Sequence, residues 1–171
     1  MRSAAPGSPP SERSPAAHKP LRTEEGIVER VADGDTITVI TANQTKLRIR
    51  MVGIDAPETP KGAKFPGQPY GKEAEVYLKQ LIEGKRVKVE IYGVDRYQRL
   101  LSTILLDGKN INLAMIEAGL AEVYRGPESD NPYKQQYKAA EDTARSAKKN
   151  MWVQGEKYES PRAYRKRVGI S

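Results

Sequence analysis

Short runs of alternating apolar and polar residues constrain this chain more than any other feature of its sequence. In one run Leu47, Ile49 and Met51 alternate with Arg48 and Arg50. Because successive side chains of a strand point to opposite faces, the apolar three share one face and both arginines share the other. The run therefore predicts a strand with one buried face, and it places Arg50 outside the core.

The same kind of pattern recurs along the chain and gives an order of elements. Strand-like alternation fills residues 26–52, broken by a hairpin turn at 42–44, and returns at 87–92 and 99–106. Helices are predicted over 71–83, 110–118 and 132–150, and a brief extended piece over 121–124. Five strands with a helix between the third and the fourth are typical of a small Greek-key barrel of the OB type. We predict an α+β protein, mainly β: a five-stranded OB-fold barrel with three helices.

The two ends of the chain differ from this middle. Residues 1–22 are rich in proline and serine and lack the apolar core of a signal peptide. We predict a disordered tail or leader over 1–23, one domain over 24–152 and a basic tail over 153–171. No stretch is long and apolar enough to span a bilayer, so we expect no membrane insertion.

Charge and residue usage restrict the chemistry. The formal net charge is +7 and the pI is near 9.5, which favours a polyanionic partner such as nucleic acid over an anionic membrane surface. There is no cysteine, and the single histidine, His18, lies in the N-terminal tail. Cysteine nucleophiles, thiolate metal sites and a histidine base inside the fold are thereby excluded. A hydrolase of this composition would use a carboxylate base and a metal bound by oxygen, which indicates Ca²⁺ or Mg²⁺.

Two acidic motifs stand out in this basic chain. They are Asp-Gly-Asp-Thr at residues 33–36 and Asp-Ala-Pro-Glu-Thr at residues 55–59. An antiparallel hairpin brings Asp35 and Asp55 together, and two neighbouring carboxylates repel unless a cation separates them. We predict that Asp35, Asp55 and the backbone carbonyl of Ala56, which is held extended by the proline after it, bind the cation. Asp33 is expected only to form the turn.

The other candidate catalytic residues are Glu58, Arg50 and Arg99. Glu58 lies three residues beyond Asp55 and is our candidate for the base that deprotonates water. Guanidinium groups bind phosphate oxygens in a bidentate fork, so Arg50 and Arg99 are the candidate phosphate clamp. Arg48 shares the face of Arg50 but lies farther from the acids, and we expect it to be structural or peripheral.

Several further residues could contact a ligand or could only pack. Tyr97 and Tyr124 could stack on bases or could supply core aromatic area, because tyrosine is the main aromatic residue of this chain. Trp152 is expected to pack. Lys61 and Lys64 lie in an irregular loop at residues 60–70, where a solvent-facing position is favoured over contact with nucleic acid.

These motifs together resemble the staphylococcal nuclease (thermonuclease) family. The matching runs occur in family order at residues 33–36, 50–59, 70–74, 95–99, 112–121 and 150–152. Each run alone is weak, but six in order are specific, and they cover residues 26–152. The resemblance implies an OB barrel with three helices and a Ca²⁺-dependent phosphodiesterase that acts on single-stranded DNA and RNA, and we expect the protein to be a monomer.

The resemblance also assigns roles. It implies that Asp35, Asp55 and the Ala56 carbonyl bind Ca²⁺, that Glu58 activates water, and that Arg50 and Arg99 bind the scissile phosphate. Arg96 and Tyr97 fall where the family contacts the neighbouring phosphate, and Tyr124 matches one of two family tyrosines; the second is missing here. The implied reaction breaks the P–O5′ bond and leaves 3′-phosphate ends. A secreted or cell-envelope location is favoured by the same resemblance.

Two other classes of function remain as alternatives. A non-catalytic OB-fold module could bind nucleic acid without cleaving it, but such a module has no need of Glu58 beside Asp35 and Asp55. A basic protein could instead dock on anionic lipid, but the chain lacks a convincing basic amphipathic helix. The filled catalytic positions favour the enzyme.

Overall fold

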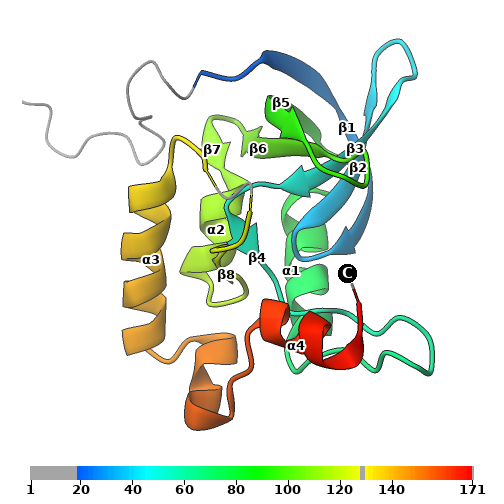
Figure 1. The fold of residues 1–171 in the computed structure, drawn as a ribbon. Coiled ribbons are helices and arrows are strands. Elements are labelled where there is room, and N and C mark those ends of the chain that lie inside the picture. The colour runs from blue at the N-terminus through cyan, green and yellow to red at the C-terminus, as the bar shows by residue number, and fades with distance from the viewer. Residues whose placement is uncertain (1–18, 128–129, 171) are drawn as a thin grey trace, which may run out of the picture.

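The computed structural model describes residues 19–127 and 130–170, and its centre is a closed barrel (Figure 1). The barrel strands are β1 (Arg22–Asp33), β2 (Thr36–Thr41), β3 (Lys46–Met51), β5 (Arg86–Val94) and β6 (Leu100–Leu106). They lie in the order β3-β2-β1-β5-β6, and a parallel pairing of β3 with β6 closes the barrel. The predicted five-stranded barrel of the OB type is confirmed.

Short strands and helices cover the barrel and extend from it. The strands are β4 (Ile54–Asp55), β7 (Lys109–Asn110) and β8 (Glu122–Val123); the helices are α1 (Gly71–Ile82), α2 (Ile111–Glu117) and α3 (Lys134–Ser146). The helix predicted over residues 132–150 corresponds to α3, which ends earlier, at Ser146. Lys148 and Asn150 have φ values of 53° and 42°, a left-handed conformation that a continuing helix cannot hold.

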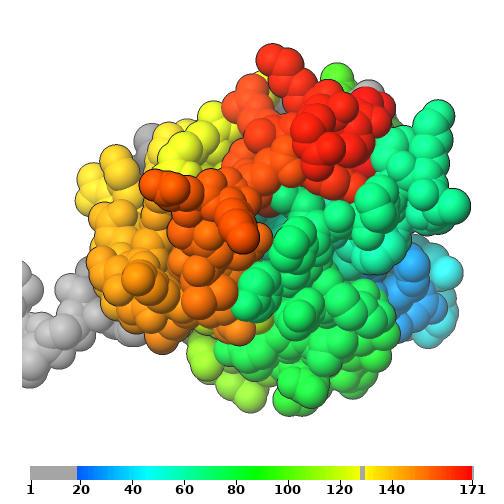
Figure 2. All heavy atoms as spheres, turned by 90° about the horizontal axis from the view of Figure 1, so that it is seen from below, coloured from blue at the N-terminus to red at the C-terminus, as the bar shows by residue number. Residues whose placement is uncertain are grey.

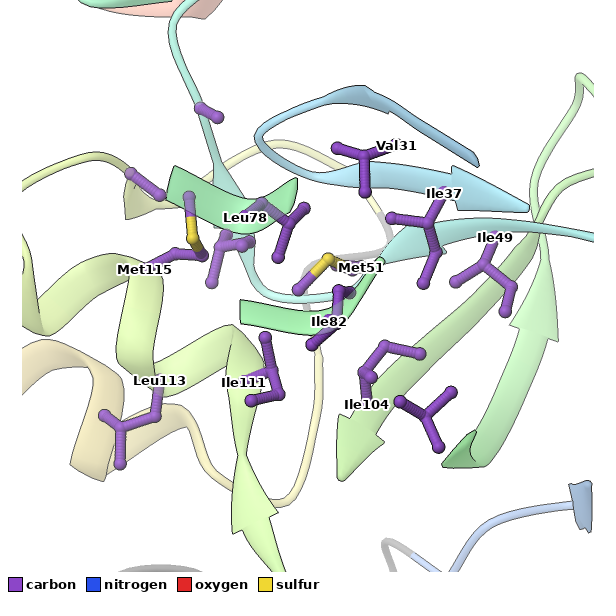
Figure 3. Close-up of a cluster of buried hydrophobic side chains, with 14 of the residues drawn as sticks. Val31, Ile37, Ile49, Met51, Leu78, Ile82, Ile104, Ile111, Leu113 and Met115 are labelled. Carbon is purple, nitrogen blue, oxygen red and sulfur yellow. The ribbon is translucent and has the colours of Figure 1, made fainter. Parts of the chain in front are cut away.

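The core forms where the barrel strands meet the helices (Figure 3). Leu47, Ile49 and Met51 of β3 are buried, while Arg48 is exposed, as the alternation predicted. Helix α1 buries Ala74, Leu78 and Ile82, which recur at the helical spacing. The buried faces of the barrel strands and of α1 and α2 pack together in the main core, and a second, smaller cluster contains Ala144, Met151 and Trp152.

A buried amide fixes the end of β3 against β6. The Nδ2 group of Asn112 donates to the carbonyl oxygens of Val52 and Ser102, at 3.0 and 3.1 Å. Its Oδ1 accepts from the backbone N–H of Ile104 at 3.0 Å. Because an unpaired buried polar group is costly, this fully used amide sets the path of the chain as it leaves β3 toward Asp55.

The chain after residue 152 was predicted only as a basic tail, and it is helical. A 3₁₀ segment, η2 (Asn150–Lys157), leads to α4 (Pro161–Val168). Seen from below, α4 lies in red against the green-cyan loop of residues 60–70 (Figure 2). The division into 1–23, 24–152 and 153–171 stays a prediction, and most of the first segment lies outside the described residues. Among residues 19–127 and 130–170, no helix is both long and apolar enough to cross a membrane.

Candidate active site

The β1–β2 turn carries Asp35 to the mouth of the barrel. Gly34 lies so close to Ala56 and Ala74 that an added Cβ would stand 2.8 Å from each of their Cβ atoms. Glycine is therefore required for this close approach. Asp35 is fixed in turn, because its Oδ2 accepts from the backbone N–H of Ala56 at 2.8 Å and its Oδ1 accepts from the Thr36 hydroxyl at 3.0 Å.

Asp35 and Asp55 lie on either side of one guanidinium. The Nη2 atom of Arg50 is 3.5 Å from Asp35 Oδ2 and 3.5 Å from Asp55 Oδ1. Burial opposes the charged form of Arg50, yet the two carboxylates hold its pKa above the ordinary value. Arg50 also donates to the carbonyl oxygen of Met51 at 2.6 Å and lies over the Tyr124 ring. The hairpin thus brings these predicted residues together.

Glu58 joins this group from the loop that follows β4. Its Oε1 lies 3.0 Å from the Lys61 ammonium, and its Oε2 accepts from Arg165 Nη1 at 2.8 Å. Gly71 lets helix α1 begin against this loop, since a Cβ there would stand 2.2 Å from the Glu58 carbonyl oxygen. Both carboxylate oxygens of the predicted base are therefore held by cationic side chains.

Asp33 forms the turn, as expected, and also binds the loop of residues 60–70. It accepts a hydrogen bond from the Thr59 hydroxyl and lies 3.4 Å from the Lys61 ammonium. Burial raises the pKa of the Asp33 carboxyl, and the nearby Asp35 acts in the same direction. Asp33 and Lys61 thus fix the segment that carries Glu58, and Lys61 is paired rather than directed only to solvent.

The second predicted arginine is held locally. The Nε group of Arg99 donates to Asp95 Oδ2 at 2.8 Å, and Arg99 and Arg96 both lie against the Tyr97 ring. The Tyr97 side chain is exposed, with 40% of its surface accessible. Arg96, Tyr97 and Arg99 therefore present two guanidinium groups and an aromatic face at one edge of the site.

One cleft of about 730 Å³ brings most of the predicted residues together. Its walls include, from the barrel side, Asp35, Arg48, Arg50, Glu58, Arg96, Tyr97, Arg99 and Tyr124, and from α4, Arg162, Arg165 and Lys166. Asp55 and Ala56 are buried behind this wall. We call Asp35, Asp55 and Glu58 the acidic centre. Around it the walls of the cleft carry mainly basic side chains.

Strand β8 pairs with β4, the strand that carries Asp55. Glu122 pairs with Asp55 across the β4–β8 ladder, and its Oε1 accepts from the Tyr158 hydroxyl at 2.5 Å. Burial raises the pKa of Glu122 to about 7, although the Tyr158 hydrogen bond opposes the shift. Tyr158, which directly follows η2, is thus linked to the strand that pairs with Asp55.

The donors suit a hard cation. Asp35 and Asp55 offer carboxylate oxygens, the donors that Ca²⁺ and Mg²⁺ prefer. Within the part of the chain that the structure describes, no three Asp, Glu, His or Cys side chains gather closely enough to form a metal centre. A cation bound between Asp35 and Asp55 would therefore need backbone and water oxygens as well.

Arg165 is a site residue that the sequence did not point to. It donates from Nη1 to Asp55 Oδ1 at 3.0 Å and from Nη2 to Asp55 Oδ2 at 2.9 Å, in addition to its bond to Glu58. A signal for its helix was present. Ser160 and Pro161 are a helix start, and Gly169 is a helix end, so residues 161–168 could have been predicted as a capped helix. Nothing local indicated which partner it would meet.

A closed OB-type barrel whose mouth gathers two aspartates, a glutamate and several arginines defines a class of small β-barrel proteins with acidic residues set in a basic cleft. The particular family follows from comparison with known proteins. The model of the staphylococcal nuclease homologue family matches residues 48–154, and the chain belongs to this family.

Curated relatives agree with this assignment. The chain is 38% identical over 132 residues to a "Probable endonuclease lcl3" of Botryotinia fuckeliana. The aligned region covers 71% of this chain and 49% of the relative. It is 37% identical over 135 residues to a "Probable endonuclease LCL3" of Saccharomyces cerevisiae, covering 74% and 48%. The chain thus spans about half the length of these relatives.

Proposed function

We propose that this chain is a Ca²⁺-dependent nuclease that hydrolyses phosphodiester bonds of single-stranded DNA and RNA. The observation that carries the proposal is the convergence of Asp35, Asp55, Glu58 and Arg50 at the mouth of a basic cleft. Family membership supports it, because this family generally depends on a metal ion and relatives are named endonucleases. A binding module would need the basic cleft but not the acidic centre.

Asp35, Asp55 and the Ala56 carbonyl are the proposed cation ligands. A bound Ca²⁺ would supply positive charge against the phosphate and its attacking water. Arg50 and Arg99 bind the non-bridging phosphate oxygens and stabilise the charge that grows on them in the transition state. Arg96 and Tyr97 hold the neighbouring phosphate, and Tyr124, beside Arg50, borders the nucleotide.

Glu58 is the proposed general base. It takes a proton from water, the water oxygen bonds to phosphorus, and the P–O5′ bond breaks with its electron pair left on O5′, which takes up a proton. The products carry 3′-phosphate and 5′-hydroxyl ends. For this step one Glu58 oxygen must be free of Lys61 or Arg165, because each oxygen already accepts from one of these cationic side chains and must instead accept from water.

The test is cleavage of a labelled single-stranded DNA and a matched RNA with Ca²⁺, with Mg²⁺ and with chelator, with the product ends identified. We expect cleavage with Ca²⁺, none with chelator, and 3′-phosphate ends. Glu58→Gln should keep the fold and Ca²⁺ binding yet lose about 10²–10⁴ in rate. Binding of both nucleic acids without cleavage at any Ca²⁺ concentration would leave the binding module as the correct reading.

A further inference from the structure

Helix α4 reaches the site as a fixed element. The side chain of Ser160, the N-cap that precedes the helix, accepts from the Ala163 N–H at 3.0 Å. Tyr164 is buried, and its hydroxyl accepts from the Gly67 N–H at 2.9 Å. Gln68 Nε2 donates to the Glu159 carbonyl oxygen at 2.8 Å. These contacts tie α4 to the loop that carries Glu58, so the place of Arg165 is set by packing as well as by charge.

Arg165 uses both oxygens of Asp55. Its two terminal nitrogens form a fork on that carboxylate, and one of them also bonds to Glu58. The Asp55 side chain is 1% exposed and that of Arg165 is 19% exposed. Charge-assisted hydrogen bonds of this geometry are strong where water is excluded. Arg165 therefore neutralises Asp55, a proposed cation ligand, and Glu58, the proposed general base.

The same helix offers an internal comparison. Arg167 forms a similar fork on Glu159, but its side chain is 62% exposed and that of Glu159 is 32% exposed. Exposed ion pairs of this kind contribute little. Arg165 and Arg167 thus differ in their burial and in whether their partner belongs to the site.

We infer that Arg165 is a positioning residue of the site that competes with a divalent cation for Asp55. The inference rests on the proposal that Asp35 and Asp55 hold the cation. A carboxylate oxygen that accepts from a guanidinium is a poorer ligand, and two positive charges on one carboxylate repel each other. Cation binding must therefore loosen the Arg165–Asp55 fork, and the fork must in turn weaken cation binding. Such coupling between two ligands of one group is reciprocal.

Calorimetric titration of the full chain with Ca²⁺, without nucleic acid, tests the competition. Arg165→Gln should bind Ca²⁺ tighter than the wild type, on the order of tenfold, within the range usual for coupled sites. Arg167→Gln removes the same charge two residues away and should leave the affinity unchanged. A purely structural Arg165 would give an unchanged or weaker affinity in the Arg165→Gln variant, and either result overturns the inference.

A second variant and a second measurement guard against misfolding. Arg165→Lys keeps the charge but cannot form the fork, and it should fall between the wild type and Arg165→Gln in affinity. In the wild type, saturating Ca²⁺ should speed amide hydrogen exchange in α4, and no change or added protection in α4 would contradict the competition.

The outcomes also separate this inference from the proposed function. A wild type that cleaves with Ca²⁺ while Arg165→Gln binds no tighter overturns the competition alone. Tighter Ca²⁺ binding by Arg165→Gln with no cleavage by any variant supports the competition and overturns the nuclease. If neither the wild type nor Arg165→Gln binds Ca²⁺, both proposals fail.

Discussion

Arg50 of β3 and Arg165 of α4 hold the same carboxylate, but they reach it from different parts of the molecule. Arg50 lies five residues before Asp55, on a barrel strand whose alternation fixes its face. Arg165 lies 110 residues after Asp55, on a helix beyond the segment that the family model matches. Arg50 touches Asp35 and Asp55 at 3.5 Å, whereas Arg165 forms shorter bonds to Asp55 and Glu58.

The difference separates two tasks within one site. The Arg50 guanidinium is held by the Met51 carbonyl and by the Tyr124 ring as well as by the acids, so part of its support does not depend on the acids. Arg165 has the acids as its partners, and although burial opposes its charged form, its hydrogen bonds to Asp55 raise its pKa. We expect Arg50 to act on the substrate and Arg165 to act on the acids.

Of the effects that follow from this comparison of the two arginines, the largest is expected from Arg50. Arg50→Lys should lower the cleavage rate by about 10²–10³-fold, because an ammonium cannot reproduce the planar fork on phosphate oxygens. The measurement is single-turnover cleavage of a short DNA with saturating Ca²⁺. Arg48→Lys, on the same face of the same strand, is the control and should have a much smaller effect. Equal losses in the two variants would mean that Arg50 contributes only positive charge to the cleft.

The next effect concerns Glu122, which pairs with Asp55 across the β4–β8 ladder and accepts from the Tyr158 hydroxyl. The folded pKa of Glu122, about 7, lies above its ordinary value of 4.5, so the folded state holds the proton more tightly. The free energy of unfolding should therefore fall as pH rises from about 4.5 to 7, by up to about 3 kcal/mol. Glu122→Gln should remove this slope.

Urea unfolding between pH 4.5 and pH 8, in chelator, measures the Glu122 effect. The exposed residue Glu156 of η2 supplies the control, and Glu156→Gln should keep the wild-type slope. A Glu122→Gln protein with the same pH dependence as the wild type would assign the slope to another group.

The smallest effect tests how α4 is anchored. Tyr164→Phe removes the acceptor of the Gly67 N–H while keeping the buried ring, and it should cost about 1 kcal/mol. Amide exchange in α4 should then be roughly fivefold faster, as follows from that free energy. Tyr77→Phe on α1 removes a hydroxyl elsewhere and should leave α4 exchange unchanged. An unaltered rate in Tyr164→Phe would show that the bond to the Gly67 N–H does not anchor α4.

Much of the fold and part of the site could be predicted, because the responsible interactions are local or periodic. The alternation of apolar and polar residues predicted the buried face of β3, and the helical spacing of apolar residues predicted α1. The hairpin gave the approach of Asp35 and Asp55, since the two ends of an antiparallel pair meet. The end of α3 was missed, because a left-handed residue such as Lys148 has no strong sequence signal.

The sequence by itself determined the strands, the barrel class, the basic charge and the group of acids with Arg50, since each depends on period, composition or short separation along the chain. Only the tertiary structure decided that Arg165 holds Asp55 and Glu58. The physical reason is that a long-range ion pair depends on where α4 packs, and that packing follows from Tyr164, Gln68 and the loop between β4 and α1 acting together. No pattern in residues 161–168 specifies that position.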